Sequence, residues 1–575
     1  MPTLSWLGKE KVVNHHLDVP FFVLDKKYSF DTQRNATQRN ATQRNATLYQ
    51  ENQSNTINNR IIHGDNLTVL KSLLPEFEGK VNCIYIDPPY NTGNEGWVYN
   101  DNVNDPRIIK WLGDVVGKEG EDLSRHDKWL CMMYPRLKLL HRLLADDGVI
   151  FISIDNNEQA VLKILCDEIF GISNYISMLT CINNPKGRSD DKYFATAHEY
   201  ILVYKKNSDF EISGFEAEEK VTKRYNKVDE LGKYREIDLR KTGDSDRRID
   251  RPDMFYPFYF YQKANLLSLY KRDLDEACIT IYPMKSLTEE GRWRWGKNEK
   301  TIKENFHKLA AVFMPKKQQW TIIEKDYLEN RSQVKPTTVW DFKDVNSERG
   351  TELLYTYLGF SKQDFPNPKP LGTIQRCIKL LTNKDAIILD SFAGSGTTAH
   401  AVLELNAQDG GNRRFILCEM MDYAESITAE RVRRVMEGYG EGNKKVEGLG
   451  GSFDFYELGD ALFSESGLLN ESVGIKRIRQ YIAYSESIPL DNQLPIENEI
   501  SPSALGLNQQ TLWLFHYNKD AITSLDLDFL GTLNLQNIPR PSQFVVYADK
   551  CVLDDKFMQK HGITFKRIPR DIMRF

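Results

Sequence analysis

The chain has 575 residues, of which 41% are hydrophobic and 11% aromatic, so it can form several globular domains. Its formal net charge of −5 excludes an overall basic surface, and a nucleic-acid partner would need a local basic cluster. The 8 cysteines include no C-x-x-C pair, which argues against a zinc site or a disulfide framework. We expect a cytoplasmic protein, because the N-terminus is too polar for a signal peptide and no apolar run could span a bilayer.

Residues 1–60 are predicted to form an N-terminal arm that contains a loop. Residues 31–60 are rich in Asn, Gln, Thr and Arg and poor in residues that build a core. The unit QRNAT is repeated without change within residues 32–47. A period of five residues matches neither a helix nor a strand, so we expect this repeat to be a solvated loop.

Residues 61–205 alternate between strand and helix patterns. Strands are predicted at residues 60–63, 81–86, 149–154 and 199–204, and helices at residues 67–74, 128–144 and 156–170. The second helix is expected to end at Asp146-Asp147-Gly148. The apolar strands are of the buried parallel-sheet type. This alternation predicts a doubly wound, Rossmann-like α/β sheet.

The alternation is interrupted once and then returns. Between residues 206 and 340 charged and aromatic residues dominate, which indicates an inserted domain. In residues 341–440 the pattern resumes with a strand, a glycine-rich turn, a helix and a further strand that ends at Glu419. Residues 441–575 hold short strand-like and helical runs, and we expect a separate C-terminal α+β domain there.

A glycine-rich turn in residues 390–398 (DSFAGSGTT) follows a predicted strand and precedes a helix. Its glycines let a ligand approach the backbone, and the helix N-terminus offers free N–H groups to an anion. Glu419, at the end of the next strand, can accept the hydroxyls of a ribose. Because the Lys of a phosphate-binding loop is missing, S-adenosylmethionine fits better than NAD or ATP. Taken alone, the turn is also compatible with glycines that serve only helix packing.

A second motif, DPPY, occupies residues 87–90 at the end of a buried strand. Two successive prolines make a stiff turn at the sheet edge where α/β proteins bind ligands. The Asp87 carboxylate and the Pro88 carbonyl could accept both hydrogens of an exocyclic amine and direct its lone pair toward a methyl donor. The ring of Tyr90 could stack on the base. An ordinary Asp-Pro turn is the alternative.

These two motifs resemble the catalytic and cofactor motifs of DNA amino-methyltransferases. DPPY precedes F392-x-G394-x-G396, and the inserted region lies between them, as in the permuted β-class arrangement. The resemblance implies that Gly64-Asp65-Asn66 lies near the adenine of the cofactor and that residues 367–370 (NPKP) close its methionine end. Asp rather than Ser before Pro-Pro-Tyr favours adenine N6 over cytosine N4.

The candidate site residues follow from these motifs and from the resemblance. The catalytic candidates are Asp87, Pro88, Pro89 and Tyr90; the cofactor candidates are Asp65, Asn66, Lys369, Asp390, Phe392, Ala393, Gly394, Gly396, Thr397, Thr398 and Glu419. We expect no metal, since direct displacement of a methyl group depends mainly on positioning. The pair His198-Glu199 is interpreted as a polar strand end rather than a metal site.

Further segments resemble the modification (Mod) subunits of Type III restriction–modification systems. They are HGDNL (63–67), HEYILVY (198–204), residues 240–257, GRWRW (291–295) and FPNPKP (365–370). The resemblance covers most of residues 5–440, is weaker in 441–575 and does not include 31–60. It implies a homodimer on double-stranded DNA, a flipped target adenine and a restriction (Res) subunit with ATP-dependent helicase and nuclease activity. We assign target recognition to residues 206–340, and the length and placement of residues 441–575 suggest an interaction or dimerisation region.

The alternatives concern activity and partners. The chain could be an orphan methyltransferase without a nuclease partner, or a sequence-specific DNA-binding subunit that is catalytically silent. In residues 206–340, basic residues interleaved with aromatic rings suit contacts with phosphates and bases. A solvated charged face over an aromatic core would have the same composition.

The repeat itself is better explained by its gene than by its fold. The pentanucleotide CAACG, read three times, encodes Gln-Arg-Asn-Ala-Thr. Slippage by one unit would shift the reading frame before Asp65, Asp87 and the glycine loop. We therefore expect phase-variable expression, a property that the resemblance to Type III modification genes also implies.

Overall fold

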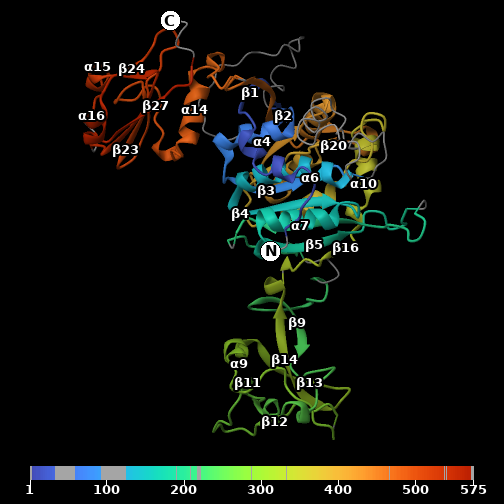
Figure 1. Ribbon diagram of the computed structural model, residues 1–575. Coiled ribbons are helices and arrows are strands. Elements are labelled where there is room, and N and C mark those ends of the chain that lie inside the picture. Colours follow the sequence, from blue (N-terminus) through green and yellow to red (C-terminus); the bar gives the residue numbers. More distant parts are fainter. Residues whose placement is uncertain are drawn as a thin grey trace. The chain divides into compact units, whose positions relative to one another are not determined.

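The computed structural model describes residues 3–32, 58–91, 125–188, 191–207, 209–216, 222–286, 288–331, 333–464, 466–536, 538 and 540–570. The chain divides into two compact units (Figure 1). One consists of Met1–Ile212 and Thr337–Phe575, and the other is Ser213–Pro336. Nearly all of the repeat, from residue 33 to residue 47, lies outside the described residues, and so does its predicted loop structure.

A ten-stranded sheet forms the centre of the first unit, in the order β1-β21-β2-β18-β17-β3-β4-β6-β5-β16. Its parallel part runs from β21 through β2, β18 and β17 to β3 and β4. The bounds of these strands are β2 (Arg60–His63), β3 (Val81–Ile86), β4 (Leu144–Ile154), β17 (Ile387–Asp390), β18 (Arg414–Glu419) and β21 (Ser452–Ala461). The predicted α/β class is confirmed.

The edges of the sheet were only partly predicted. β6 (Glu199–Lys205) runs antiparallel to β4 and to β5 (Tyr175–Cys181), and β16 (Val339–Trp340) closes this edge. At the other edge, β1 (Phe22–Asp31) runs antiparallel to β21. Residues 22–31 and 452–461 therefore belong to the large sheet, not to an arm or a separate C-terminal domain. Long-range pairing decides this, because neither segment is a continuous apolar run.

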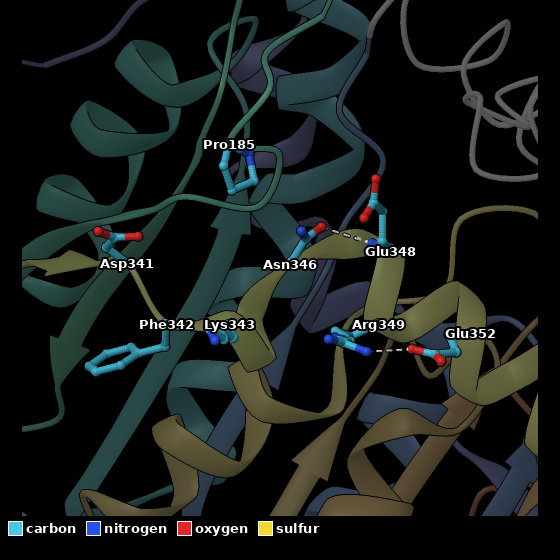
Figure 2. A pocket seen from close by; sticks show the side chains of 8 residues that line it. All are labelled: Pro185, Asp341, Phe342, Lys343, Asn346, Glu348, Arg349 and Glu352. Carbon is cyan, nitrogen blue, oxygen red and sulfur yellow. Dashed lines mark hydrogen bonds and ion pairs between the residues drawn. The ribbon is translucent and has the colours of Figure 1, made fainter. Parts of the chain in front are cut away.

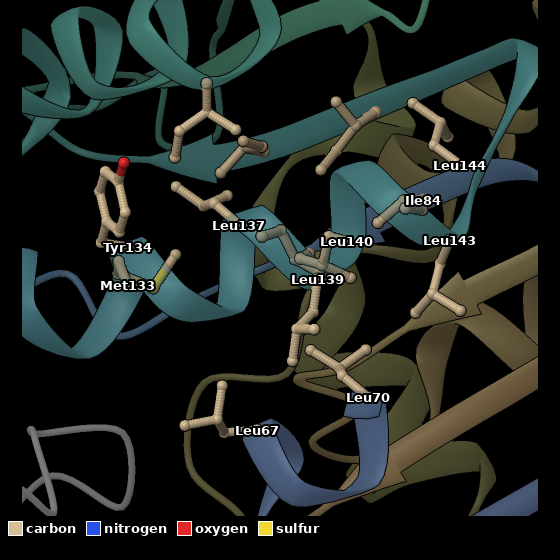
Figure 3. Close-up of a cluster of buried hydrophobic side chains, with 14 of the residues drawn as sticks. Leu67, Leu70, Ile84, Met133, Tyr134, Leu137, Leu139, Leu140, Leu143 and Leu144 are labelled. Carbon is tan, nitrogen blue, oxygen red and sulfur yellow. The ribbon is translucent and has the colours of Figure 1, made fainter. Parts of the chain in front are cut away.

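Helices cover both faces of the parallel strands. α6 (Arg125–Leu143) contacts both α4 (Asn66–Phe77) and α7 (Gln159–Phe170), and the three helices share a core with strand residues such as Ile84 (Figure 3). Leu389 and Ile416 belong to the same core. On the opposite face, α11 (Leu371–Lys379) contacts β3, and α12 (Thr397–Asp409) contacts β18 and α13 (Glu430–Glu437). This is the doubly wound arrangement that the sequence predicts.

The boundary between α6 and β4 differs from its prediction. The helix ends at Leu143, and Leu144 already pairs with Val81 of β3. The predicted stop, Asp146-Asp147-Gly148, lies inside β4, where a register shift accommodates it. These polar residues thus lie in the irregular first part of β4, which the helical spacing of apolar residues does not predict.

The rest of the first unit contains a smaller sheet in the order β22-β23-β25-β27. Its strands are β22 (Ala504–Leu507), β23 (Thr511–Phe515), β25 (Gln543–Ala548) and β27 (Ile563–Arg567), and the neighbouring helices are α14 (Ile475–Ser485), α15 (Leu527–Gly531) and α16 (Asp555–Lys560). Two apolar clusters, around Ile478 and around Val546, form its core. The strand-like runs expected within residues 441–575 include β23 and β25.

The second unit, Ser213–Pro336, is mainly β structure. One sheet has the order β13-β14-β9-β8, with β8 (Lys227–Asp229), β9 (Gly232–Asp238), β13 (Leu309–Met314) and β14 (Gln319–Tyr327). The other has the order β11-β10-β12, with β10 (Phe258–Tyr261), β11 (Leu266–Ser268) and β12 (Ile279–Ile281). Phe258 and Trp293 are fully buried in its core. Many aromatic residues of this region are therefore core residues.

Candidate functional site

The predicted site residues converge at the carboxyl ends of the parallel strands. Asp65 follows β2, Asp87 follows β3, Asp390 ends β17 and Glu419 ends β18. Because these strands are neighbours and parallel, their carboxyl ends lie along one edge of the sheet, where open α/β sheets bind ligands. The structure thus brings the two sequence motifs together from opposite sides of the insertion.

The turn after β3 is held on both sides. The indole N–H of Trp129 donates a 2.7 Å hydrogen bond to the carbonyl oxygen of Pro89. Asn91, which ends the turn in the left-handed region with φ of 56°, donates from its side chain to the buried Glu158. Pro88 and Pro89 restrict the backbone that joins Asp87 to these anchors. The Asp87 carboxylate therefore projects from a fixed backbone.

Four side chains meet at this turn. The ammonium of Lys369 lies 2.6 Å from Oε2 of Glu199, 2.5 Å from the hydroxyl of Tyr90 and 3.3 Å from Oδ1 of Asp87. The hydroxyl of Tyr90 donates to the same oxygen of Glu199, at 3.1 Å. We call these residues, Asp87, Tyr90, Glu199 and Lys369, the carboxylate–lysine cluster. Lys369 thus contacts the predicted catalytic motif, and Glu199 joins the candidate site although the sequence analysis interprets it only as a polar strand end.

The charges in this cluster shift one another. Burial raises the pKa of Asp87, although the attraction of Lys369 opposes that rise. Burial would lower the pKa of Lys369, but the attraction of Asp87 and Glu199 outweighs it and raises that pKa above its usual value. Lys369 is therefore protonated at any ordinary pH and supplies a permanent positive charge.

The glycine turn forms a tight corner between β17 and α12. Gly394 and Gly396 have φ of 52° and 80°, in the left-handed region that favours glycine. A Cβ atom at Gly396 would lie 3.0 Å from the carbonyl oxygen of Thr428. Asp390 closes the corner, because its oxygens accept hydrogen bonds from the backbone N–H of Phe392, at 3.0 Å, and from the hydroxyl of Thr398, at 2.5 Å.

The remaining loop residues have internal partners. The N–H of Ala393 donates to the carbonyl of Cys418 at 3.1 Å, and Phe392 packs partly against the main core. Thr397 and Thr398 are both buried, and each hydroxyl contacts protein. Their side chains build the loop, so the backbone rather than these hydroxyls is available to a ligand.

Glu419 lies directly beside this loop. Its Oε2 accepts from the N–H of Gly394 at 2.7 Å, and its Oε1 accepts from the N–H of Met421 at 3.0 Å. Burial raises the pKa of Glu419 and the pKa of Asp390, each to about 7. In both residues the hydrogen bonds that the carboxylate accepts lower the pKa and only partly oppose this rise. Two carboxyl groups at adjacent strand ends thus titrate near neutrality, which is typical of functional sites.

The residues after β2 are tied to the same loop. The amide of Asn66 donates to the carbonyl of Ser391 at 3.0 Å, and Arg136 of α6 donates to the Asn66 side-chain oxygen at 2.6 Å. Asp65 caps α4 by accepting from the N–H of Thr68 at 3.0 Å. Asn66 is thereby a link between β2 and the glycine turn. The buried Arg136 that orients it has no sequence signature.

A second buried arginine supports the glycine turn from behind. Arg431 donates to the hydroxyls of Ser395, at 2.8 Å, and Thr397, at 2.7 Å. It is 1% exposed, and burial lowers its pKa to about 10. Its other guanidinium nitrogen lies 3.4 Å from His400, whose ring contacts Glu404 at 3.1 Å. Only the tertiary structure reveals this support, since Arg431 lies beyond every recognised motif.

A pocket of about 290 Å³ lies elsewhere in the first unit (Figure 2). It is lined by Pro185, Asp341, Phe342, Lys343, Asn346, Glu348, Arg349 and Glu352. None of the predicted site residues lines it. The side chains of Arg349 and Glu352 pair with each other at 2.6 Å beside it. We place the candidate site at the strand ends, where the convergent polar groups lie, and not at this pocket.

No group of three or more His, Cys, Asp or Glu side chains in the described residues is arranged to hold a metal ion. None of the helices in the described part of the chain combines the length and hydropathy that crossing a bilayer requires.

Comparison with known proteins identifies the family. Residues 81–430 match the family model described as DNA methylase. The chain is 37% identical to the Type III restriction-modification enzyme EcoPI Mod subunit of Escherichia phage P1, over 64% of this chain and 58% of that subunit. It is 38% identical to the Type II methyltransferase M.KpnI of Klebsiella pneumoniae, over 62% of this chain and 79% of the relative. The StyLTI Mod subunit of Salmonella typhimurium is 34% identical, over 63% of this chain and 52% of the subunit.

Solved structures give weaker likenesses. The putative DNA modification methylase TTHA0409 of Thermus thermophilus, complexed with S-adenosyl-L-methionine, is 16% identical over 65% of this chain and 95% of that chain, with a TM-score of 0.28. The M1.HpyAVI–SAM complex is 13% identical over 65% of this chain and 98% of that chain, with a TM-score of 0.28. These TM-scores are too low to inform function. The chain spans only 58% of the EcoPI Mod subunit and 52% of the StyLTI Mod subunit.

The family match covers both motifs, the insertion between them and most of the sheet that brings them together. The chain therefore belongs to the DNA methylase family, and its relatives include Mod subunits of Type III restriction–modification enzymes.

Proposed function

We propose that this protein is a site-specific DNA methyltransferase that uses S-adenosylmethionine to methylate N6 of adenine in double-stranded DNA. The observation that carries the proposal is the position of Asp87. Its carboxylate follows a rigid double-proline turn and lies at the same sheet edge as Glu419 and the glycine turn. A hydrogen-bond acceptor and a nucleoside-binding edge are thereby next to each other.

The chemistry of the donor set suits S-adenosylmethionine. When bound, this cofactor supplies an electrophilic methyl group on a positively charged sulfur. Glu419 would accept the ribose hydroxyls, Asp65 and Asn66 would line the adenine end, and the glycine turn would let the backbone approach. Lys369 touches Asp87 and Glu199, so it holds the catalytic turn in addition to any contact with the methionine end.

The chain's own residues would then prepare the amine. Asp87 and the carbonyl of Pro88 accept hydrogen bonds from the two N6 hydrogens, and Tyr90 stacks on the flipped base. These bonds localise the amine lone pair and stabilise the positive charge that develops on nitrogen. The bound cofactor would supply the methyl group, and its sulfur would keep the electron pair of the broken C–S bond. The amine would form the new C–N bond and lose one proton to water.

Methyl transfer is tested directly with tritiated S-adenosylmethionine and genomic DNA from a strain that lacks this gene. We expect labelled DNA that yields N6-methyl-2′-deoxyadenosine on digestion, and N4-methyl-2′-deoxycytidine would contradict the adenine assignment. Asp87→Asn should reduce transfer by about 10²- to 10³-fold, because it removes a preorganised charge at the reacting amine. Asp146→Asn, at an exposed carboxylate, is the control. Undiminished transfer by Asp87→Asn would remove Asp87 from the mechanism.

The inserted unit is the proposed target-recognition domain. Its aromatic core leaves an exposed segment with Arg247, Arg248 and Arg251, which suits contacts with DNA phosphates and base edges. Single-molecule sequencing of the host genome, with and without the gene, would report the methylated motif. Arg251→Ala should weaken binding to that motif. A change in the slope of affinity against salt would indicate a phosphate contact, and a relaxed motif would indicate a base contact.

The relatives support a restriction context, since two of them are Mod subunits of Type III enzymes. We propose a homodimer that also guides a Res subunit with ATP-dependent helicase and nuclease activity. Light scattering should give twice the chain mass of 66.6 kDa, and a coexpressed Res subunit should copurify. A protein that methylates without any such partner would be the orphan enzyme, whereas no cofactor binding in calorimetry would favour a silent DNA-binding subunit.

We also propose that expression is phase-variable through the repeat in residues 32–47. The proposal is supported by the genetic code, since repeated CAACG units translate to repeated QRNAT units. Sequencing the coding DNA from single colonies should show tracts that differ by one five-base unit. Mixed synonymous codons without a CAACG tract would exclude the mechanism.

A further inference from the structure

Glu199 is a buried carboxylate at the first position of β6, and no recognised motif gives it a task. Its Oε2 accepts from the ammonium of Lys369 at 2.6 Å and from the hydroxyl of Tyr90 at 3.1 Å. A buried carboxylate is costly unless it is paired, and here both partners touch the catalytic turn. Glu199 is therefore coupled to the reacting groups although it lies on another strand.

The single cation of the cluster is shared unequally between the two carboxylates. Lys369 lies 2.6 Å from Glu199 but 3.3 Å from Asp87, so Glu199 is its main partner. The side chain of Asp87 is 22% exposed, whereas that of Glu199 is 5% exposed. A substrate amine could thus reach Asp87 but not Glu199. The ion pair with Lys369 uses Oδ1 of Asp87.

We propose that Glu199 is a positioning residue for methyl transfer, which retains Lys369 and Tyr90 so that Asp87 stays free to accept a hydrogen bond from the target amine. This inference rests on the proposed function. Without the charge of Glu199, Lys369 would pair with Asp87 alone and compete with the amine for its oxygens. Tyr90 would also lose the acceptor that fixes its hydroxyl.

The surroundings of Asp87 give the expected direction of its titration. The charged or titratable groups that face it or lie at neighbouring strand ends are Lys369, Glu199, Tyr90, Tyr85, Asp390 and Asp155. Glu199 raises the pKa of Asp87 and Lys369 lowers it. Removing the charge of Glu199 should therefore lower that pKa, and removing the charge of Lys369 should raise it further.

Single-turnover methyl transfer between pH 5 and 9 tests the inference, with a duplex that carries the motif found by genome sequencing. Glu199→Gln should slow transfer by about 10- to 100-fold at neutral pH, since Asp87 is then misdirected. In Glu199→Gln, the acid limb of the profile of transfer rate against pH should move to lower pH. In Lys369→Met, the same limb should move to higher pH. Glu168→Gln is the matched control, because Glu168 forms a comparable ion pair with Lys9 at 2.7 Å. Transfer at the wild-type rate, or slower transfer with an unmoved acid limb, would overturn the role of Glu199.

Unfolding measurements decide the matter independently of activity. A double-mutant cycle of Glu199→Gln and Lys369→Met should show coupling in thermal unfolding, and additive effects would overturn the inference. If Glu199→Gln does not fold, Glu199→Asp keeps the charge and should keep the acid limb of the wild type. If the wild-type protein transfers no methyl group, the proposed function is contradicted. The double-mutant cycle would still show whether Glu199 and Lys369 are coupled in the carboxylate–lysine cluster.

Discussion

The backbone N–H of Gly394 donates a 2.7 Å hydrogen bond to Oε2 of Glu419, which ties the glycine turn after β17 to the end of the neighbouring strand β18. The carboxylate of the proposed cofactor site is thereby oriented by the loop that would contact the ligand.

Glu419→Gln should weaken binding of S-adenosylmethionine by about 10- to 100-fold, because a charged hydrogen bond contributes about 1.5–3 kcal/mol. Titration calorimetry measures this directly. Since burial raises the pKa of Glu419 to about 7, affinity of the wild type should fall as the pH drops below that value. Affinity of Glu419→Gln should lack this dependence. Equal affinity of the two proteins at pH 8 would exclude Glu419 from the ribose site.

Asp390 makes the free energy of unfolding depend on pH. Its pKa is raised from 3.8 to about 7 in the folded state, so folding takes up a proton between these values. Stability from this group is therefore greatest at low pH, falls by at most about 1.4 kcal/mol per pH unit as the pH rises toward 7, and is level above it.

Asp390→Asn should flatten that slope, measured as the urea midpoint between pH 5 and 8. Asp146→Asn, which changes an exposed carboxylate, should keep the slope of the wild type. Parallel slopes for Asp390→Asn and the wild type would show that Asp390 does not titrate in this range. Asn retains an oxygen for the N–H of Phe392, so the corner itself should survive the substitution.

Gly396→Ala should reduce affinity for S-adenosylmethionine. The residue has φ of 80°, and the added Cβ would approach the carbonyl oxygen of Thr428 at 3.0 Å, so the turn must shift. Gly410→Ala is the matched control, because Gly410 has φ of 67° and nothing within 4 Å of the added atom. Both substitutions should cost about 1 kcal/mol of stability from the backbone conformation, but only Gly396→Ala should change cofactor affinity. If Gly396→Ala and Gly410→Ala bind S-adenosylmethionine with equal affinity, the tight turn at Gly396 does not contribute to cofactor binding.

Arg431→Met should loosen the glycine turn, since the hydroxyls of Ser395 and Thr397 would lose their donor. We expect cofactor binding to weaken by about tenfold, in line with about 1–2 kcal/mol for lost hydrogen bonds to a charged group. Arg413→Met is the control, because Arg413 is also buried but pairs with Asp409 at the far end of α12. Weakening of the same size in both variants would indicate a general loss of stability rather than support of the turn.

The amino-acid sequence by itself determined the local parts of this protein. Alternating strand and helix periods predicted the α/β class, because periodicity depends on neighbours within a turn or a strand. The double proline of residues 88–89 and the glycines 394 and 396 marked the two strand ends that carry chemistry, since these residues restrict or permit backbone conformations directly. The order of the two motifs around an insertion indicated the permuted arrangement.

Only the tertiary structure decided which distant side chains meet. Lys369 and Glu199 are 170 positions apart in the chain but 2.6 Å apart in space, and Arg431 reaches Ser395 across 36 positions. Such contacts depend on strand order and helix packing, which leave no periodic mark in the sequence. The pairing of β1 with β21 is likewise a long-range event between two segments of mixed polarity. A short motif can show where chemistry occurs, but the fold selects the groups that orient it.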